Sequence, residues 1–152
     1  QGTAVVARRP MITIIAVGLG VATACLGLQS LTALVALKYF IGGAAASGAR
    51  RRAPITFRSM ALLMLVLSIG SIVQMIAWAL VYLALGQFGD FETALYFSGV
   101  TFTSLGFGDI TLIGTARLLA PLQAANGLMM FGFSTAVLIN ALHDSPARHG
   151  PR

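Results

Sequence analysis

The sequence predicts an all-α membrane protein with three transmembrane helices, one short re-entrant helix and an irregular loop. Its 152 residues are 57% hydrophobic and 9% charged, with a mean hydropathy of +0.88. A soluble domain of this length has too little interior to bury so much apolar surface. Three segments approach or exceed the roughly 20 apolar residues that a span requires, at residues 11–38, 59–85 and 116–142.

The first segment, residues 11–38, is expected to be a retained transmembrane helix. A cleaved signal peptide is the alternative, because Arg8 and Arg9 precede it and small residues follow it. Its apolar stretch is about twice the usual length of a signal peptide core, which favours a retained helix. The single cysteine, Cys25, is expected to be a small packing residue. Small side chains along the segment allow close packing, either on the same chain or on a second copy.

The basic residues predict the orientation. Residues 39–58 form a basic connection, which the positive-inside rule places in the cytoplasm with the tail at residues 143–152. This orientation puts seven of the ten Lys and Arg residues inside and three outside, so residues 1–10 are expected to be extracellular. Charges at the ends of spans indicate contact with membrane lipids, and no nucleic-acid partner is expected despite the net charge of +6.

The connection between the second and third spans predicts the re-entrant element. Residues 91–103 can form a helix with Asp90 as its cap and Glu92 in its first turn. This helix is too short to cross a bilayer. Irregular backbone at membrane depth, as expected for residues 104–108, is tolerated only where protein or a water-filled cavity surrounds it. The carboxylates of Asp90, Glu92 and Asp109 either concentrate cations at this mouth or simply lie where a loop admits charge.

Residues 103–109 read Thr-Ser-Leu-Gly-Phe-Gly-Asp and resemble the selectivity filter of potassium channels, whose usual form is Thr-Thr-Val-Gly-Tyr/Phe-Gly-Asp. The resemblance extends over residues 59–142. It implies a pore domain with an outer helix at 59–85, a pore helix at 91–103, a filter at 104–108 and an inner helix at 116–142. It also implies a potassium-selective channel that conducts passively as a homotetramer, in a cell membrane of bacterial inner-membrane type.

In this family, backbone carbonyls of several copies replace the water around a potassium ion. The resemblance therefore assigns K⁺ ligands to residues 104–108, with the ion held at Ser104, Leu105, Gly106 and Phe107. Gly106 and Gly108 are suited to positive φ angles, which let successive carbonyls point the same way. The Phe107 side chain is expected to point away from the axis and to pack against a pore helix.

Four further residues are expected to support the filter: Thr103, Asp109, Tyr96 and Val100. Val100 occupies the position where some bacterial channels place a glutamate that partners the aspartate, here Asp109. Without that carboxyl group, Asp109 must find another donor or stay solvated. Phe107 lacks the tyrosine hydroxyl that would reach aromatic residues of the pore helix such as Tyr96.

On the inner helix, Leu128, Phe131, Thr135 and Ile139 recur at spacings of three and four residues and share one face. The resemblance implies that this face lines the cavity, with Leu142 near the cytoplasmic gate. A lipid-facing or helix-packing stripe is the alternative.

Three other positions of the inner helix carry separate expectations. Gly127 resembles the hinge glycine of the family, with close helix packing as its alternative. Pro121 is expected to disturb the hydrogen-bond ladder near the helix start. The Asn126 amide is expected to bond to a neighbouring backbone or to the region behind the filter.

Other function classes fit less well. No span carries arginine at every third position, so no voltage sensor is expected. No small-molecule ligand domain and no cofactor besides the conducted ion are expected. An enzyme is not expected, because the spans contain no His, Asp or Glu. A weakly selective cation channel and a non-conducting membrane scaffold remain as alternatives.

Overall fold

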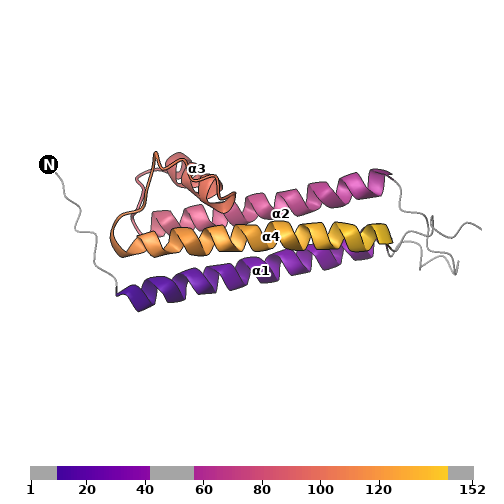
Figure 1. Ribbon diagram of the computed structural model, residues 1–152, viewed down its shortest axis with the longest axis horizontal. Helices are drawn as coiled ribbons and strands as arrows, with labels where there is room; N and C mark the ends of the chain where they lie inside the picture. The colour runs from indigo at the N-terminus through magenta and orange to yellow at the C-terminus, as the bar shows by residue number, and fades with distance from the viewer. Residues whose placement is uncertain (1–9, 42–56, 144–152) are drawn as a thin grey trace, which may run out of the picture. The chain divides into compact units, whose positions relative to one another are not determined.

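The computed structural model describes residues 10–41 and 57–143, and within them the chain is helical and contains no strand. Its elements are α1 (Met11–Ile41), α2 (Phe57–Ala84), α3 (Phe91–Phe102), the short 3₁₀ helix η2 (Gly114–Leu118) and α4 (Leu119–His143) (Figure 1). Three stretches are long and apolar enough to cross a membrane: Met11–Ala36, Arg58–Ala84 and Gly114–Asn140. The predicted all-α membrane fold is confirmed, and the protein is a multi-pass membrane protein.

The third span starts with a change of helix type. Gly114 has a φ of 64°, and η2 precedes the α-helix proper, which begins at Leu119. The two helices are continuous, because the Leu119 N–H donates to carbonyl oxygens of η2. Pro121 follows this change closely and has no N–H to donate to the preceding turn, and its expected disturbance of the ladder stays a prediction.

The described residues belong to two compact units. The first contains Ile72–Met129 together with the part of α1 up to Leu26, and so includes all of α3. Its core contains residues from each of the four α-helices, from η2 and from the segment before η2. They are Ile14, Cys25, Trp78, Tyr82, Phe97, Leu112, Ala116 and Leu119. The ring of Tyr82 packs edge-on against Phe97 and Phe88, with centroid distances of 5.2 and 6.1 Å.

The second unit contains Gly27–Ser71 and the chain from Met130 onward. Its core is formed by Ala33, Ala36, Leu63, Leu67 and Val137. Gln29 of α1 is fully buried and donates a hydrogen bond of 3.4 Å to Ser134 of α4. A Cβ atom at Gly70 of α2 would lie 2.7 Å from the Gln29 carbonyl oxygen, so the missing side chain makes room for this glutamine.

In the single chain, helix α1 packs on α4 and α2 of the same chain, which is the first of the two arrangements left open by the sequence. In the first unit, Gly18 of α1 faces Leu119 and Leu122 of α4, each 2.8 Å from where a Cβ atom would lie. Cys25 is buried, as expected for a packing residue, and lies beside Asn126 of α4 and Trp78 of α2. The small residues of α1 allow these close approaches.

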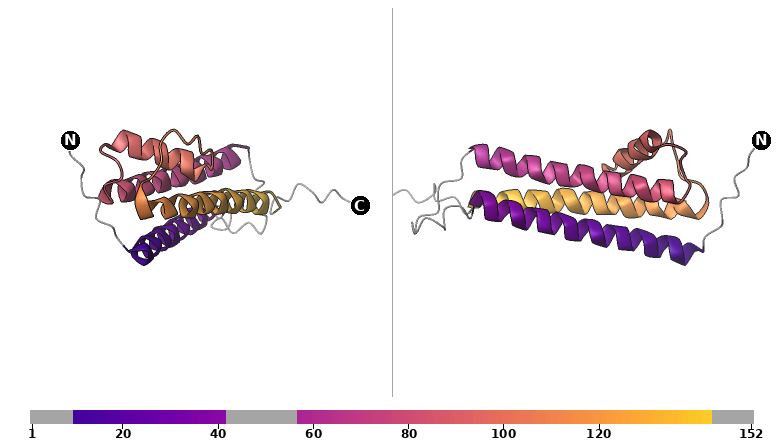
Figure 2. Two further views of the ribbon diagram at one scale, coloured as in Figure 1. Left: turned by 60° about the vertical axis from the view of Figure 1, so that its left-hand side comes forward. Right: turned by 180° about the vertical axis from the view of Figure 1, so that it is seen from behind.

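The segment after α3 returns to the start of α4 near the end of α2 (Figure 2). The backbone N–H of Ile113 donates to the side-chain oxygen of Gln87 at 2.9 Å. The Arg117 side chain donates to the carbonyl oxygen of Leu112, also at 2.9 Å. Both bonds hold the last part of this segment, next to η2, within the first unit.

Candidate functional site

Helix α3 begins at a side-chain cap, as the sequence predicts. The backbone N–H of Thr93 donates to Asp90 at 2.8 Å, and the Thr93 hydroxyl donates to the same carboxylate at 2.9 Å. The hydrogen bond from the Thr93 N–H holds the pKa of Asp90 below its ordinary value. With 12 residues, α3 is about 18 Å long, which is too short to cross a bilayer.

A buried polar network fixes the middle of α3, and sequence reasoning missed it. Gln123 of α4 donates to the carbonyl and hydroxyl oxygens of Ser98 at 3.1 and 2.6 Å. The Ser98 hydroxyl donates to the carbonyl oxygen of Met75 in α2 at 2.7 Å, and Tyr82 donates to Gln123 at 2.5 Å. The signal was available in the sequence, because polar side chains are costly within transmembrane segments and therefore mark specific contacts.

The C-terminal end of α3 rests on α4 at Gly127. A Cβ atom on Gly127 would lie 2.8 Å from the carbonyl carbon of Phe102, and closer still to its oxygen. The backbones of the two helices therefore approach as closely as a glycine allows. This contact favours the close-packing interpretation of Gly127, and α4 continues as a helix through this residue.

The 104–108 loop that follows α3 has an alternating backbone. Ser104, Gly106 and Gly108 have φ angles of 58°, 57° and 77°, whereas Leu105 and Phe107 do not have positive φ. Alternation between the left-handed and ordinary regions turns successive peptide groups so that their N–H groups face one side and their carbonyls the other. The positive φ expected for both glycines is confirmed.

Ser104 is the only described residue other than glycine with a positive φ, which no sequence pattern predicted. A residue with a Cβ atom in the left-handed region costs about 1–3 kcal/mol, which persists where the surrounding structure over-determines it. The next two backbone N–H groups, of Leu105 and Gly106, donate to the carbonyl oxygen of Val100 at 2.9 and 3.4 Å. These bonds tie the start of the loop to the last turn of α3.

The residues expected to support the loop make specific contacts. Tyr96 donates a hydrogen bond of 2.7 Å to Asp109. Tyr96 thus supplies Asp109 with the donor that Val100 cannot provide. This bond to Asp109 raises the pKa of Tyr96. The Thr103 hydroxyl donates to the carbonyl oxygen of Gly99 at 2.8 Å and so turns back onto α3.

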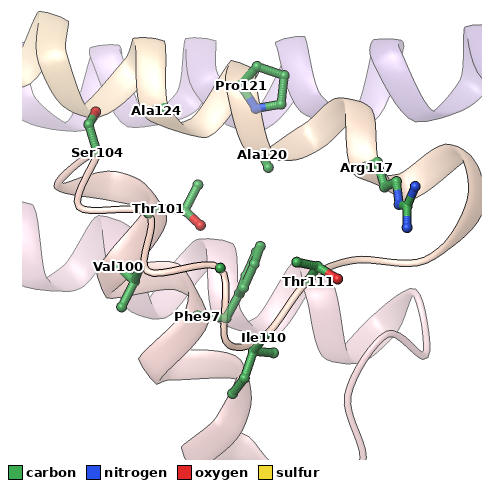
Figure 3. Close-up of a pocket in the computed structure, with 12 residues that line it drawn as sticks. Phe97, Val100, Thr101, Ser104, Ile110, Thr111, Arg117, Ala120, Pro121 and Ala124 are labelled. Atoms are coloured by element: carbon green, nitrogen blue, oxygen red, sulfur yellow. The ribbon is translucent and has the colours of Figure 1, made fainter.

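The apolar side chains of the loop are not covered by their own chain. Leu105 and Phe107 are 57% and 65% exposed, so Phe107 is not buried against the α3 helix of the same chain. Beside the loop lies an open, mainly apolar groove of about 500 Å³ (Figure 3). It is lined by Phe97, Val100, Thr101, Ser104, Gly106, Gly108, Ile110, Thr111, Arg117, Ala120, Pro121 and Ala124.

The residues expected to line a cavity lie on α4 and are exposed in the single chain. Leu128, Phe131 and Ile139 expose roughly half of their surface or more. Thr135 is exposed as well, and its hydroxyl donates to the Phe131 carbonyl oxygen at 2.9 Å. The Leu142 side chain lies outside the described part of the structure.

Asn126 departs from its expected role. It is fully buried, and neither polar atom of its amide makes a hydrogen bond of good geometry among the described residues. Within the same part of the chain, no three His, Cys, Asp or Glu side chains are grouped as metal ligands.

A family model described as "Ion channel" matches residues 61–144, which is more than half of the chain. The matched segment contains α3, the 104–108 loop and α4. Comparisons with curated proteins and with solved structures found no match.

Proposed function

The chain belongs to the ion channel family, and we propose that it conducts potassium ions passively and selectively through a pore formed by four copies. The observation that carries the proposal is the alternating backbone of the 104–108 loop, with positive φ at Ser104, Gly106 and Gly108. Its carbonyls form a row of oxygens, and rings of such oxygens replace the hydration shell of a dehydrated cation. The ion ligands are the carbonyls of Ser104, Leu105, Gly106 and Phe107.

The exposure of the loop supports assembly from several copies. Leu105 and Phe107 leave large apolar surfaces uncovered beside the groove, and such surfaces mark contacts with another chain. A closed cyclic tetramer brings the loop of each copy to one axis. In this assembly, Phe107 of one copy packs against α3 of the next, which replaces the contact that its own chain does not make.

Helix α3 contributes an electrostatic term to the same site. Its C-terminal end lies directly before the loop, and a helix C-terminus carries about half a negative charge. Four such ends around an axis stabilise a cation below the loop. At the outer end, the hydrogen bond from Tyr96 to Asp109 holds the residue that follows Gly108.

The inner half of the pore follows α4. Leu128, Phe131, Thr135 and Ile139 line the cavity, and Leu142 lies at the cytoplasmic gate. The orientation rests on the basic residues: Lys38 and Arg58 lie at the end of α1 and the start of α2, on the cytoplasmic side. The three arginines at 50–52 and those at 148 and 152 lie outside the described residues and belong to the same side.

The test is a flux measurement on purified protein in liposomes. Barium-sensitive efflux of potassium that exceeds sodium efflux is the expected result. Gly106→Ala is expected to abolish potassium flux, because the φ of 57° at Gly106 is unfavourable for a residue with a Cβ atom. Gly20→Ala is the matched control, because the new methyl group meets nothing within 4 Å.

Three results contradict the proposal. Equal fluxes of potassium and sodium identify a weakly selective cation channel, with Ser104 as the first residue to examine. No flux of either ion at any voltage, from protein that is folded and tetrameric, identifies a membrane scaffold. A monomeric protein in detergent and in membranes contradicts the assembly on which the row of carbonyls depends.

A further inference from the structure

A buried chain of hydrogen bonds connects three helices of the first unit. Tyr82 of α2 donates to Gln123 of α4, whose amide nitrogen donates to both oxygens of Ser98 in α3. The Ser98 hydroxyl then donates to the carbonyl oxygen of Met75 in α2. Tyr82, Ser98 and Gln123 each have 0% of their surface exposed. The path therefore starts and ends on α2 and passes through α4 and α3.

Each side-chain polar group in this network has a partner. The Tyr82 hydroxyl donates to Gln123, the Gln123 amide nitrogen donates to two oxygens of Ser98, and the Ser98 hydroxyl donates to the carbonyl oxygen of Met75. Fully satisfied networks in an apolar environment specify one arrangement of their members, since any displacement leaves a buried group without a partner. In a membrane no water is at hand to replace the lost partner.

The network includes hydrogen bonds to helix backbone as well as to side chains. Gln123 reaches the carbonyl oxygen of Ser98, and Ser98 reaches the carbonyl oxygen of Met75. Both are backbone atoms within helices, whose carbonyls can accept a second hydrogen bond. Bonds to backbone atoms fix the position of α3 along its own axis relative to α2 and α4, whereas apolar contacts tolerate sliding.

The network lies close enough to the C-terminal end of α3 to affect the position of the 104–108 loop. Ser98 precedes Phe102 by four residues, or about 6 Å along the helix. The Phe102 carbonyl group rests on Gly127, which is a second fixed point on α4. Two fixed points define the direction of a helix as well as its depth. The 104–108 loop starts two residues after the second point, so any shift of α3 moves the first carbonyl of the loop.

We propose that Gln123, together with Tyr82 and Ser98, is a positioning residue for ion selection, which sets the depth of α3 and thereby the spacing of the carbonyls in the 104–108 loop. This inference rests on the proposed function. Sites of this kind lose performance when their supporting residues allow displacements of about 1 Å. The network touches no conducted ion and acts only through α3.

The experiment measures the reversal potential of the tetrameric channel in bilayers with potassium on one side and sodium on the other. Ser98→Ala removes the hydroxyl group, and Tyr82→Phe removes a hydroxyl while keeping the ring that packs on Phe88 and Phe97. The permeability ratio of potassium to sodium is expected to fall about three- to tenfold in each, the effect of one lost hydrogen bond in a membrane protein.

Two control variants separate positioning from folding. Ser71→Ala makes the same chemical change in α2, where the Ser71 hydroxyl donates within its own helix, to the carbonyl oxygen of Leu67. Ser98→Thr keeps the hydroxyl group. Both are expected to keep the wild-type reversal potential. This potential does not depend on the number of folded channels, so a residue that serves stability alone lowers the current and leaves the potential unchanged.

The outcomes separate this inference from the proposed function. A selective wild type whose reversal potential is unchanged in Ser98→Ala and Tyr82→Phe overturns the positioning role and leaves the channel standing. A wild type without preference for potassium overturns both. If Ser98→Ala does not assemble, Tyr82→Phe decides alone, because its ring still fills the core.

Discussion

Replacing Gly127 with alanine tests the contact between α3 and α4. The new Cβ atom would lie 2.8 Å from the carbonyl carbon of Phe102, whereas non-bonded carbons prefer about 3.5–4.0 Å. The helices must separate by roughly 1 Å to relieve this overlap. The obstacle is backbone at the end of α3, so no rotation of a flexible side chain can absorb the change.

The cost follows from overpacking, which typically destabilises by about 1–3 kcal/mol. Gly132→Ala is the matched control, because it lies on the same helix and its Cβ atom meets nothing within 4 Å. Both variants replace a helical glycine with alanine, so the gain of up to about 1 kcal/mol from helix propensity is common to both. Thermal unfolding of the protein should therefore separate the two variants by about 1–3 kcal/mol, with Gly127→Ala the less stable.

The same displacement should reach the 104–108 loop, which begins two residues after Phe102. Gly127→Ala is expected to lose potassium selectivity in the bilayer measurement, and Gly132→Ala to keep it. A Gly127→Ala protein as stable and as selective as Gly132→Ala would refute the reasoning. A variant that keeps its stability and selectivity but opens less often would instead support a hinge at this residue.

Three further predictions follow from single hydrogen bonds. Tyr96→Phe removes the donor to Asp109 and should make potassium flux decay about fivefold faster during sustained conduction, as followed by time-resolved efflux. Because the pKa of Asp90 is lowered, its cap stabilises α3 fully above about pH 4 and is lost as the pH falls through the lowered value; circular dichroism should show a smaller acid-induced loss in Asp90→Asn. Gln29→Cys combined with Ser134→Cys, without the native cysteine, should cross-link within one chain on a denaturing gel, whereas dimer bands would place α1 on a neighbour.

The parts of the fold that composition and local pattern determine were predictable. Long apolar stretches have one stable form in a bilayer, so the three spans follow from residue type alone. The cap at Asp90 is set by neighbours in sequence. The positive φ of Gly106 and Gly108 follows from glycine in a motif where a Cβ atom would be costly.

The contacts that depend on distant segments were not predictable in the same way. Gln123 and Ser98 are separated by 25 residues, and Gln29 and Ser134 by 105. Nothing local tells a buried glutamine which of several helices will supply its partner. Gly127 presents the same difficulty, since a hinge and a close contact require the same residue, and only the position of Phe102 distinguishes them.

The packing of α1 on its own chain has a consequence for how the protein is made. Synthesis starts at the N-terminus, so α1 enters the membrane before the residues that it contacts have been translated. Gln29 meets Gly70 of α2 first, and its acceptor Ser134 follows only after a further 64 residues. The hydrogen bond between Gln29 and Ser134 therefore forms only after the last span has been translated, so the first and last spans are joined late in synthesis.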